Sequence, residues 1–158
     1  MRSARAPHRW TAALAVALAA LAAAGLAGCG SASGAPTTAE RLVASVRAAA
    51  KDGGTVTMTS VAHLDWDRGA FVCPADSVGA VGKALDATWT DGTPPAEGTV
   101  DVLLTSAGEV VQTLTIDLSS VDPCTGGPAL ADRTFGPTTE FAASASTAGG
   151  AVVLTRVP

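Results

Sequence analysis

The sequence predicts an α+β fold, namely a small single domain with an antiparallel β-sheet, an N-terminal helix and a second short helix on one face of the sheet. Beyond residue 36 the chain has two short segments with the apolar spacing of an amphipathic helix. Segments in which apolar and polar residues alternate, as in β-strands, are more numerous, and turn residues separate them. Two short helices cannot cover both faces of a sheet with this many strands, which favours a sheet with one solvated face.

The first predicted helix covers residues 37–52. Thr37 and Glu40 have the spacing of a capping box, in which each side chain accepts a hydrogen bond from the backbone of the other residue. Gly53 follows the last turn and provides the left-handed conformation that commonly ends a helix. The apolar stripe expected to face the core consists of Leu42, Val43, Val46, Ala49 and Ala50.

The second predicted helix begins after Pro74 and ends at Leu85. Asp76 or Ser77 provides its N-cap, because both side chains accept hydrogen bonds from the first helical turn. Two glycines inside the segment lower its helix propensity and indicate close packing on the sheet or an irregular helix. The side chains expected to face inward are those of Val78, Val81 and Leu85.

The predicted strands cover residues 55–65, 70–73, 87–90, 99–106, 109–118, 140–147 and 151–157. The clearest two flank a tight turn at Ala107-Gly108. Gly69 is expected to produce a bulge or a bend between the first two strands. Residues 119–137 contain several Pro and Gly residues and are predicted to be irregular.

Residues 1–28 have the three-part order of a secretory signal. The part over residues 1–10 carries three arginines and no acid, the part over 11–24 is an uncharged run rich in Ala, Leu and Val, and the last part consists of small residues and one leucine. The alternative is an uncleaved anchor helix, but the apolar run is shorter than the roughly 20 residues that span a bilayer.

This signal ends in the tetrapeptide Leu26-Ala27-Gly28-Cys29. It resembles the lipobox of bacterial lipoproteins, in which a leucine, a small residue and Gly or Ala precede a cysteine. The resemblance implies that the thiol of Cys29 carries a diacylglyceryl group, that a peptidase cleaves just before it, and that a fatty acid such as palmitate acylates the new amino group. It also implies a lipid anchor at the extracytoplasmic face of the cell membrane. Two or three acyl chains hold a protein stably there, since each buried CH₂ contributes about 0.8 kcal/mol.

After cleavage, residues 29–36 are a flexible tether of small residues, and residues 37–158 form the α+β domain. Three of the ten basic residues leave with the signal and none of the 14 acidic ones does, so the remaining chain has a net charge of −7. An acidic domain without a basic cluster argues against nucleic acid and against docking on anionic lipid headgroups. The acyl chains are therefore the expected contact with the membrane, and the other partner is an unidentified envelope protein or small ligand.

If Cys29 is acylated, Cys73 and Cys124 remain. Two cysteines in an exported chain predict one disulfide, which would tie the irregular segment 119–137 to the strand before Pro74. The alternative is a metal pair or a reactive thiol, and either would need more His or Cys side chains than the chain provides.

Trp66, Asp67 and Arg68 form the densest polar and aromatic cluster. Together with Pro74 and the helix after it, they resemble a pattern in small bacterial lipoproteins of uncharacterised function, in which a Trp-Asp-Arg strand precedes an apolar strand, a proline and a capped helix. This chain departs from the pattern in its helix glycines and in Ala75, where an aromatic residue is common. The resemblance implies a shared fold and no activity. One hypothesis is a binding surface with Trp66 as its anchor. The favoured alternative is a core tryptophan beside an Asp–Arg pair.

His63 and Asp65 share a face of the predicted strand 55–65, so a His–Asp pair is a candidate for acid–base chemistry. A hydrolase would also need a nucleophile, and the chain has no Gly-x-Ser-x-Gly motif. Asp65 and Asp67 share a face too, but the Asp-x-Asp-x-Asp-Gly pattern of a calcium loop is missing. A solvated strand edge is the favoured interpretation, and no catalytic residue, metal site or cofactor is predicted.

The sequence thus predicts an exported, lipid-anchored envelope lipoprotein whose domain has a binding or structural role without catalysis. The alternative is an envelope hydrolase that uses His63 and Asp65. The binding class is favoured because the chain after residue 28 has one His, two Lys and no Tyr, which leaves few catalytic groups.

Overall fold

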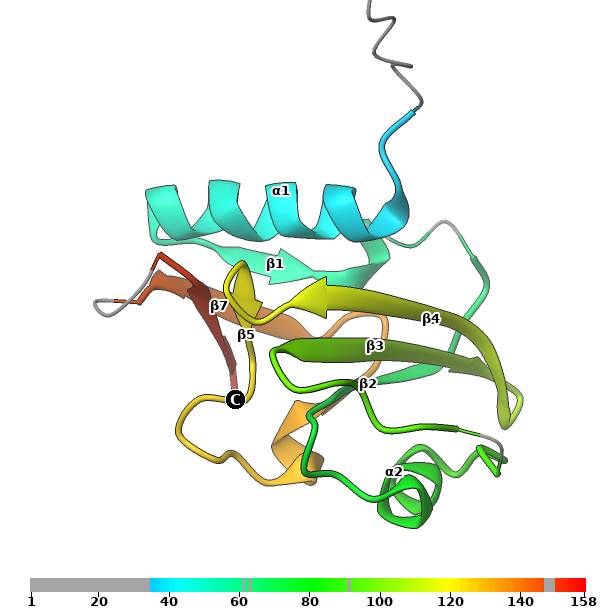
Figure 1. Cartoon of the computed structure of the whole chain (residues 1–158). Helices are drawn as coiled ribbons and strands as arrows, with labels where there is room; N and C mark the ends of the chain where they lie inside the picture. The colour runs from blue at the N-terminus through cyan, green and yellow to red at the C-terminus, as the bar shows by residue number, and fades with distance from the viewer. Residues whose placement is uncertain (1–34, 61, 63, 91, 147–149) are drawn as a thin grey trace, which may run out of the picture. The chain divides into compact units, whose positions relative to one another are not determined.

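The computed structural model describes residues 35–60, 62, 64–90, 92–146 and 150–158. The predicted signal, Cys29, most of the tether and His63 lie outside these described residues. Residues Ala35–Pro158 form one compact unit, and the described residues of this unit make two α-helices and two four-stranded sheets (Figure 1). The predicted α+β class and the small single domain are confirmed. No helix in the described ranges is long and apolar enough to cross a membrane.

The strands of the chain are shared between two sheets. The elements in chain order are α1 (Thr38–Asp52), β1 (Thr55–Thr57), the 3₁₀ helix η1 (Met58–Ser60), β2 (Arg68–Val72), α2 (Val78–Leu85), β3 (Thr99–Ser106), β4 (Glu109–Asp117), β5 (Val121–Asp122), the 3₁₀ helix η2 (Leu130–Arg133), β6 (Thr134–Phe135), β7 (Glu140–Ala145) and β8 (Val152–Arg156). Sheet 1 has the order β1-β7-β8-β5, and sheet 2 has the order β4-β3-β2-β6. Neighbouring strands are antiparallel except β5 and β8, which are parallel.

Helix α1 begins and ends as predicted. The Glu40 backbone N–H donates to Thr37 Oγ1 at 3.2 Å, and the Thr37 N–H donates to the Glu40 carboxylate at 2.7 Å. This backbone hydrogen bond, followed by that from the Thr37 hydroxyl, holds the pKa of Glu40 below its usual value. Gly53 ends the helix with a φ of 62°. Leu42 and Val46 are fully buried, and the helix packs on β1 and β7 of sheet 1 and also contacts β4.

Helix α2 packs on the face of sheet 2 that is opposite the main core. The hydroxyl of Ser77 caps it by accepting a hydrogen bond from the Ala80 backbone, as one of the two predicted caps. Val81 and Leu85 pack in a small core against sheet 2, separate from the main core under α1. The structure therefore differs from the single one-sided sheet that was expected. Strands β2 and β3 carry apolar side chains on both faces, so sheet 2 needs cover on both.

The predicted hairpin of β3 and β4 is confirmed. Ala107 and Gly108 form its turn with φ values of 52° and 81°, the left-handed conformation that tight hairpin turns require. Residues 100–105 of β3 are all buried because sheet 2 is covered on both faces. The predicted strand 87–90 is reduced to one bridge, between Thr88 and Glu109, within the described residues.

The predicted strand over residues 55–65 is wrong beyond Thr57, where β1 ends and η1 begins. Met58 and Ala62 are both buried, and the Ala62 backbone N–H donates to the Met58 carbonyl at 3.2 Å. Two buried apolar residues four positions apart are typical of a helical turn, but they also fit the alternation of a strand. The sequence pattern alone therefore did not distinguish the two conformations.

All three phenylalanines of the chain meet in the main core, and Trp66 joins them. The ring centroids lie 5.1 Å apart for Phe71 and Phe135, 5.3 Å for Phe71 and Phe141, 5.5 Å for Phe135 and Phe141, and 5.8 Å for Trp66 and Phe135. Three of these four contacts are edge-on, the arrangement that aromatic quadrupoles favour. Because Phe141 comes from sheet 1 and the other two from sheet 2, the cluster holds the sheets together.

Gly69 lies beneath this aromatic cluster. Strand β2 passes through Gly69 with regular pairing to β3, so the bulge or bend expected there is wrong. The glycine is needed for space instead, because a Cβ would lie 2.4 Å from Cε2 of Phe135 and 2.9 Å from the Leu103 carbonyl oxygen. We expect Gly69→Ala to lower the free energy of unfolding by about 2 kcal/mol, measured by urea denaturation.

Gly79→Ala is the matched control for this substitution. A Cβ at Gly79 would meet nothing within 4 Å, and the residue lies in helix α2. Alanine has the higher helix propensity, so this variant should gain about 0.5–1 kcal/mol. Equal stability of the two variants would contradict the packing role of Gly69.

Candidate functional site

The predicted disulfide is present between Cys73, directly after β2, and Cys124, just after β5, with 6.1 Å between the Cα atoms. It ties the segment after β5 to sheet 2, as expected. The carboxylate of Asp122 fixes the backbone at Cys124, on one side of the disulfide. It accepts hydrogen bonds from the backbone N–H groups of Cys124 and Thr125, both at 2.8 Å, and from the Thr125 hydroxyl.

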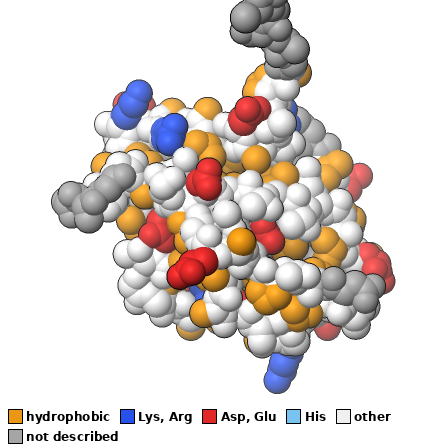
Figure 2. Space-filling model, in the orientation of Figure 1, with side chains coloured by type: hydrophobic (Ala, Val, Ile, Leu, Met, Phe, Trp, Pro, Cys, Tyr) orange, Lys and Arg blue, Asp and Glu red, His pale blue; other side chains and the backbone are white. Residues whose placement is uncertain are grey.

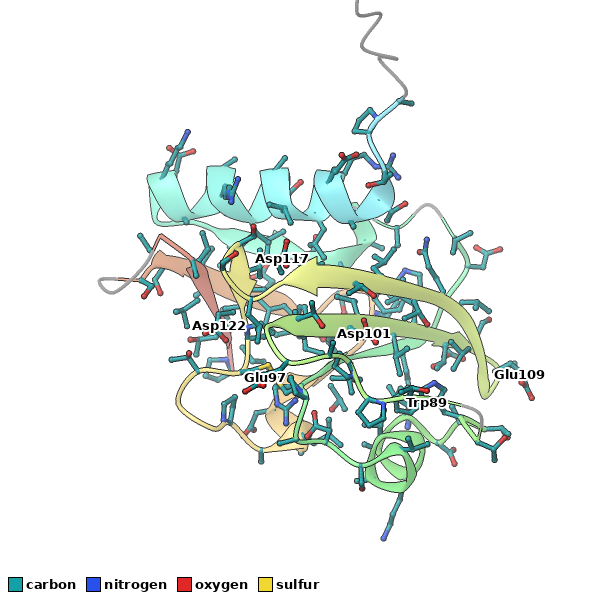
Figure 3. The ribbon with its side chains drawn as sticks, in the orientation of Figure 1. Trp89, Glu97, Asp101, Glu109, Asp117 and Asp122 are labelled. Atoms are coloured by element: carbon teal, nitrogen blue, oxygen red, sulfur yellow. A yellow bond between two sulfur atoms is a disulfide. The ribbon has the colours of Figure 1, made fainter. Side chains whose placement is uncertain are left out.

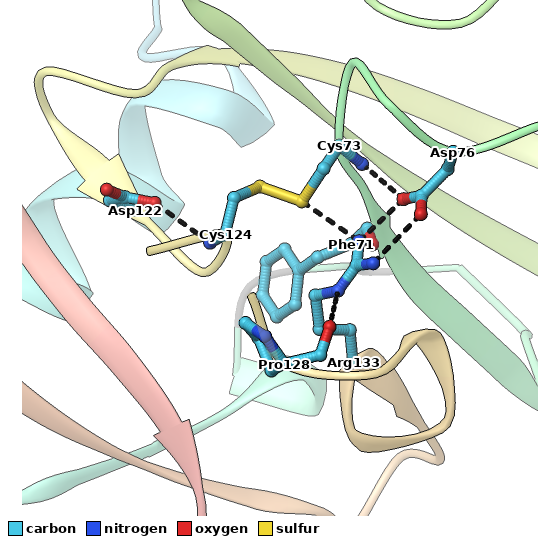
Figure 4. A network of polar contacts seen from close by, with 7 residues as sticks. All are labelled: Phe71, Cys73, Asp76, Asp122, Cys124, Pro128 and Arg133. Atoms are coloured by element: carbon cyan, nitrogen blue, oxygen red, sulfur yellow. Dashed lines mark hydrogen bonds and ion pairs between the residues drawn. A yellow bond between two sulfur atoms is a disulfide. The ribbon is translucent and has the colours of Figure 1, made fainter. Parts of the chain in front are cut away.

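A buried arginine lies against this disulfide (Figure 4). Arg133 on η2 is 8% exposed. Its Nη1 donates to the backbone oxygen of Phe71 and to Sγ of Cys73, both at 2.9 Å, and its Nε donates to the backbone oxygen of Pro128 at 3.2 Å. The guanidinium group therefore joins the end of β2 to the loop that precedes η2.

Asp76 neutralises this arginine. Its Oδ2 lies 2.6 Å from Nη1 of Arg133 and its Oδ1 lies 2.9 Å from Nη2, a bidentate ion pair. Oδ2 also accepts the backbone N–H of Cys73 at 2.7 Å. Burial on its own raises the pKa of Asp76, but the hydrogen bonds from Arg133 and Cys73 and the charge of Arg133 outweigh burial and lower that pKa. A covalent bond and an ion pair thus connect the same two segments.

The sequence patterns did not indicate this network. Arg133 was not singled out, and Asp76 was considered only as a helix cap. A signal was available in the predicted disulfide, which brings residues 119–137 next to Cys73. Arg133 is the only basic residue of that segment, and Asp76 follows Cys73 by three positions. A buried cation needs a partner, and Asp76 is an acid that this disulfide brings near Arg133.

A pocket of about 580 Å³ opens beside the disulfide, between β8 and the loop that precedes η2. Its lining includes Phe71, Phe141, Leu154, Pro123, Pro128 and Arg156. The aromatic rings belong to the main core, whereas Arg156 is exposed and donates to the backbone oxygens of Ala131 and Thr134 at 3.4 and 3.3 Å. The volume lies in the range of small-molecule sites, which are commonly apolar with a few polar groups.

The three residues of the predicted binding surface have separate roles. Trp66 is 8% exposed and belongs to the main core, as the favoured alternative expected. The carboxylate of Asp67 accepts hydrogen bonds from the Ala107 backbone at 2.9 Å and the Thr105 hydroxyl at 3.5 Å, so it holds the β3–β4 turn. Arg68 is exposed. Asp67 is therefore engaged with the turn, and Trp66 does not offer an exposed anchor.

Asp65 is exposed and precedes β2, so it does not share a strand face with Asp67. Its predicted partner His63 lies outside the described residues, and the His–Asp pair stays a prediction.

Acidic side chains are spread over the face shown in Figure 2. Figure 3 shows Glu97, Asp101 and Asp117 near β3 and β4. In the described part of the chain, no group of three or more His, Cys, Asp or Glu side chains is arranged to hold a metal ion.

Comparison of the chain with protein families, with curated proteins and with solved structures finds no match. The two resemblances noted in the sequence therefore stay predictions.

Proposed function

We propose that this chain is an exported lipoprotein of the bacterial envelope, anchored by acyl chains on Cys29, and that its domain binds a protein or a small ligand without catalysing a reaction. The observation that carries the anchor is the order of basic, apolar and small residues that ends in Leu26-Ala27-Gly28-Cys29. The Cys73–Cys124 disulfide supports export, since such bonds persist in oxidising compartments.

We expect Cys29→Ala to release the protein from the membrane or to leave its signal uncleaved. The acyl chains are the anchor in this proposal, and alanine has no thiol to accept them. The measurement is membrane fractionation combined with the mass of the mature protein. Ser31→Ala, two positions further on, is the control and should fractionate like the unchanged protein. Membrane association and processing of Cys29→Ala equal to those of the control would refute the proposal.

We place the ligand of the domain in the pocket beside the disulfide. Buried aromatic and aliphatic side chains line it, together with two arginines, Arg133 and Arg156, and one acid, Asp132. This combination fits a small molecule with an apolar body and one anionic group. The rest of the domain is acidic, so an anion would find fewer favourable contacts elsewhere.

A suitable probe is 8-anilinonaphthalene-1-sulfonate, which combines apolar rings with one sulfonate. We expect the unchanged protein to bind it with a rise in fluorescence, and Arg156→Gln to weaken binding about fivefold through loss of one charged contact. Arg47→Gln is the control, because Arg47 is an exposed arginine on α1 that does not line this pocket. Absence of binding, or equal affinity of the two variants, would contradict this placement.

The alternative of an envelope hydrolase rests on His63 and Asp65. It predicts that the unchanged protein hydrolyses a generic ester such as p-nitrophenyl acetate faster than free imidazole does. It also predicts that His63→Gln removes this excess rate. The binding proposal predicts that this variant and the unchanged protein have the same background rate.

A further inference from the structure

The two sulfurs of the disulfide have different surroundings. Cys73 is 7% exposed, and its Sγ accepts a hydrogen bond from Nη1 of Arg133 at 2.9 Å. Cys124 is half-buried, and its backbone N–H is bound by Asp122. Its neighbours Pro123 and Thr125 line the pocket, so solvent reaches the chain next to this sulfur. Cys124 is thus the more exposed of the two cysteines, while the charged donor lies on the Cys73 side (Figure 4).

We propose that Cys124 is a site of thiol–disulfide exchange and that Cys73 is the leaving group, stabilised by Arg133. In the first step a thiolate attacks Sγ of Cys124. A new S–S bond forms between the attacking sulfur and Cys124, the Cys73–Cys124 bond breaks, and its electron pair leaves on Sγ of Cys73. The resulting thiolate accepts a hydrogen bond from Nη1 of Arg133, whose two N–H groups are shared among this sulfur, the Phe71 oxygen and Oδ2 of Asp76. A charge-assisted hydrogen bond is stronger than the one made to the neutral disulfide.

The external reactant is a dithiol. Its second thiolate attacks the dithiol's own sulfur in the mixed disulfide, and the electron pair of the broken bond leaves on Sγ of Cys124. The dithiol is oxidised to a cyclic disulfide, and both cysteines are left as thiols with the two protons that the dithiol gives up. The Arg133–Asp76 ion pair joins the same two segments as the disulfide and is not broken by these steps. It therefore keeps the two sulfurs close, so the bond re-forms when an oxidant returns.

The first test identifies the sulfur that is attacked. The full chain in its oxidised form is exposed briefly to glutathione, quenched with acid, digested and analysed by mass spectrometry. We expect glutathione on Cys124 and a free thiol on Cys73. On removal of free glutathione without quenching, Cys73 should expel it from Cys124 and restore the original bond. Glutathione on Cys73, equal amounts on both residues, or a mixed disulfide that persists would overturn the proposal. This measurement needs no substitution.

The second test concerns Arg133. Arg133→Lys keeps the charge but removes the Nη1 donor, and we expect the rate of opening by glutathione to fall about tenfold through loss of one charged hydrogen bond to the leaving sulfur. A weakened fold would instead expose the disulfide and speed its opening, so a slower rate separates the two effects. Arg47→Lys replaces an exposed arginine on α1 that donates to the Ser120 hydroxyl and does not line the pocket, and it should keep the unchanged rate. An equal or faster rate in Arg133→Lys would refute the role of Arg133.

Discussion

Replacing both Cys73 and Cys124 by Ser is expected to lower the free energy of unfolding by about 4 kcal/mol. The two cysteines are 51 positions apart, and closing a loop of that length removes about this much chain entropy from the unfolded state. The loss is large against the roughly 5–15 kcal/mol by which single domains are stable, but it leaves the protein folded if its stability is in the upper part of that range. Urea denaturation of the oxidised protein and of the double variant provides the comparison.

Reduction supplies an internal control for this expectation. Excess dithiothreitol should lower the urea midpoint of the unchanged protein to near that of the double variant, and it should leave the midpoint of the double variant where it is. If the oxidised protein and the double variant unfold at the same urea concentration, the disulfide does not constrain the unfolded chain in the way described.

Replacing Arg133 by Gln is expected to lower the free energy of unfolding by about 3 kcal/mol or more. The substitution leaves the Asp76 carboxylate without its cation and the backbone oxygens of Phe71 and Pro128 without their donor. Breaking one side of a buried ion pair costs more than the pair contributes, because the remaining charge stays desolvated. Arg156→Gln removes an exposed arginine that contacts only backbone oxygens in the described structure, and it should change stability by less than about 0.5 kcal/mol. Similar losses in the two variants would contradict this account.

The same ion pair makes stability depend on pH in a defined direction. The pKa of Asp76 in the folded protein lies below its ordinary value of 3.8, so folding favours the ionised carboxylate. This contribution is fully present above the ordinary pKa and is lost as the pH falls through the lower, folded-state pKa. When the pH is lowered from about 6 to about 2, the free energy of unfolding of Asp76→Asn should therefore fall less than that of the unchanged protein. Asp132→Asn, an exposed acid next to Arg133, should keep the original profile. An equally steep loss in Asp76→Asn would argue against the pair as the cause.

Local sequence patterns predicted much of the fold. The capping box of Thr37 and Glu40, the turn at Ala107-Gly108 and the cap at Ser77 all appear in the structure where the sequence places them. Each of these features depends on residues within four positions of one another, so the chain around them carries the whole signal. The disulfide was also predictable, because the expected acylation of Cys29 leaves two cysteines and therefore one pairing.

The sequence by itself determined the helices, the central hairpin, the partners of the disulfide and the motif on which the proposed membrane anchor rests. Only the tertiary structure decided that sheet 2 is covered on both faces, that the chain leaves the strand at Met58, and that Arg133 meets Asp76 next to Cys73. The physical reason is distance along the chain. Arg133 and Asp76 are 57 positions apart, and their pairing depends on which elements pack together. An apolar face of a sheet likewise needs other elements packed against it, and no local pattern specifies which elements these are. The candidate site lies among these long-range contacts, which is why its central arginine was missed while its cysteines were found.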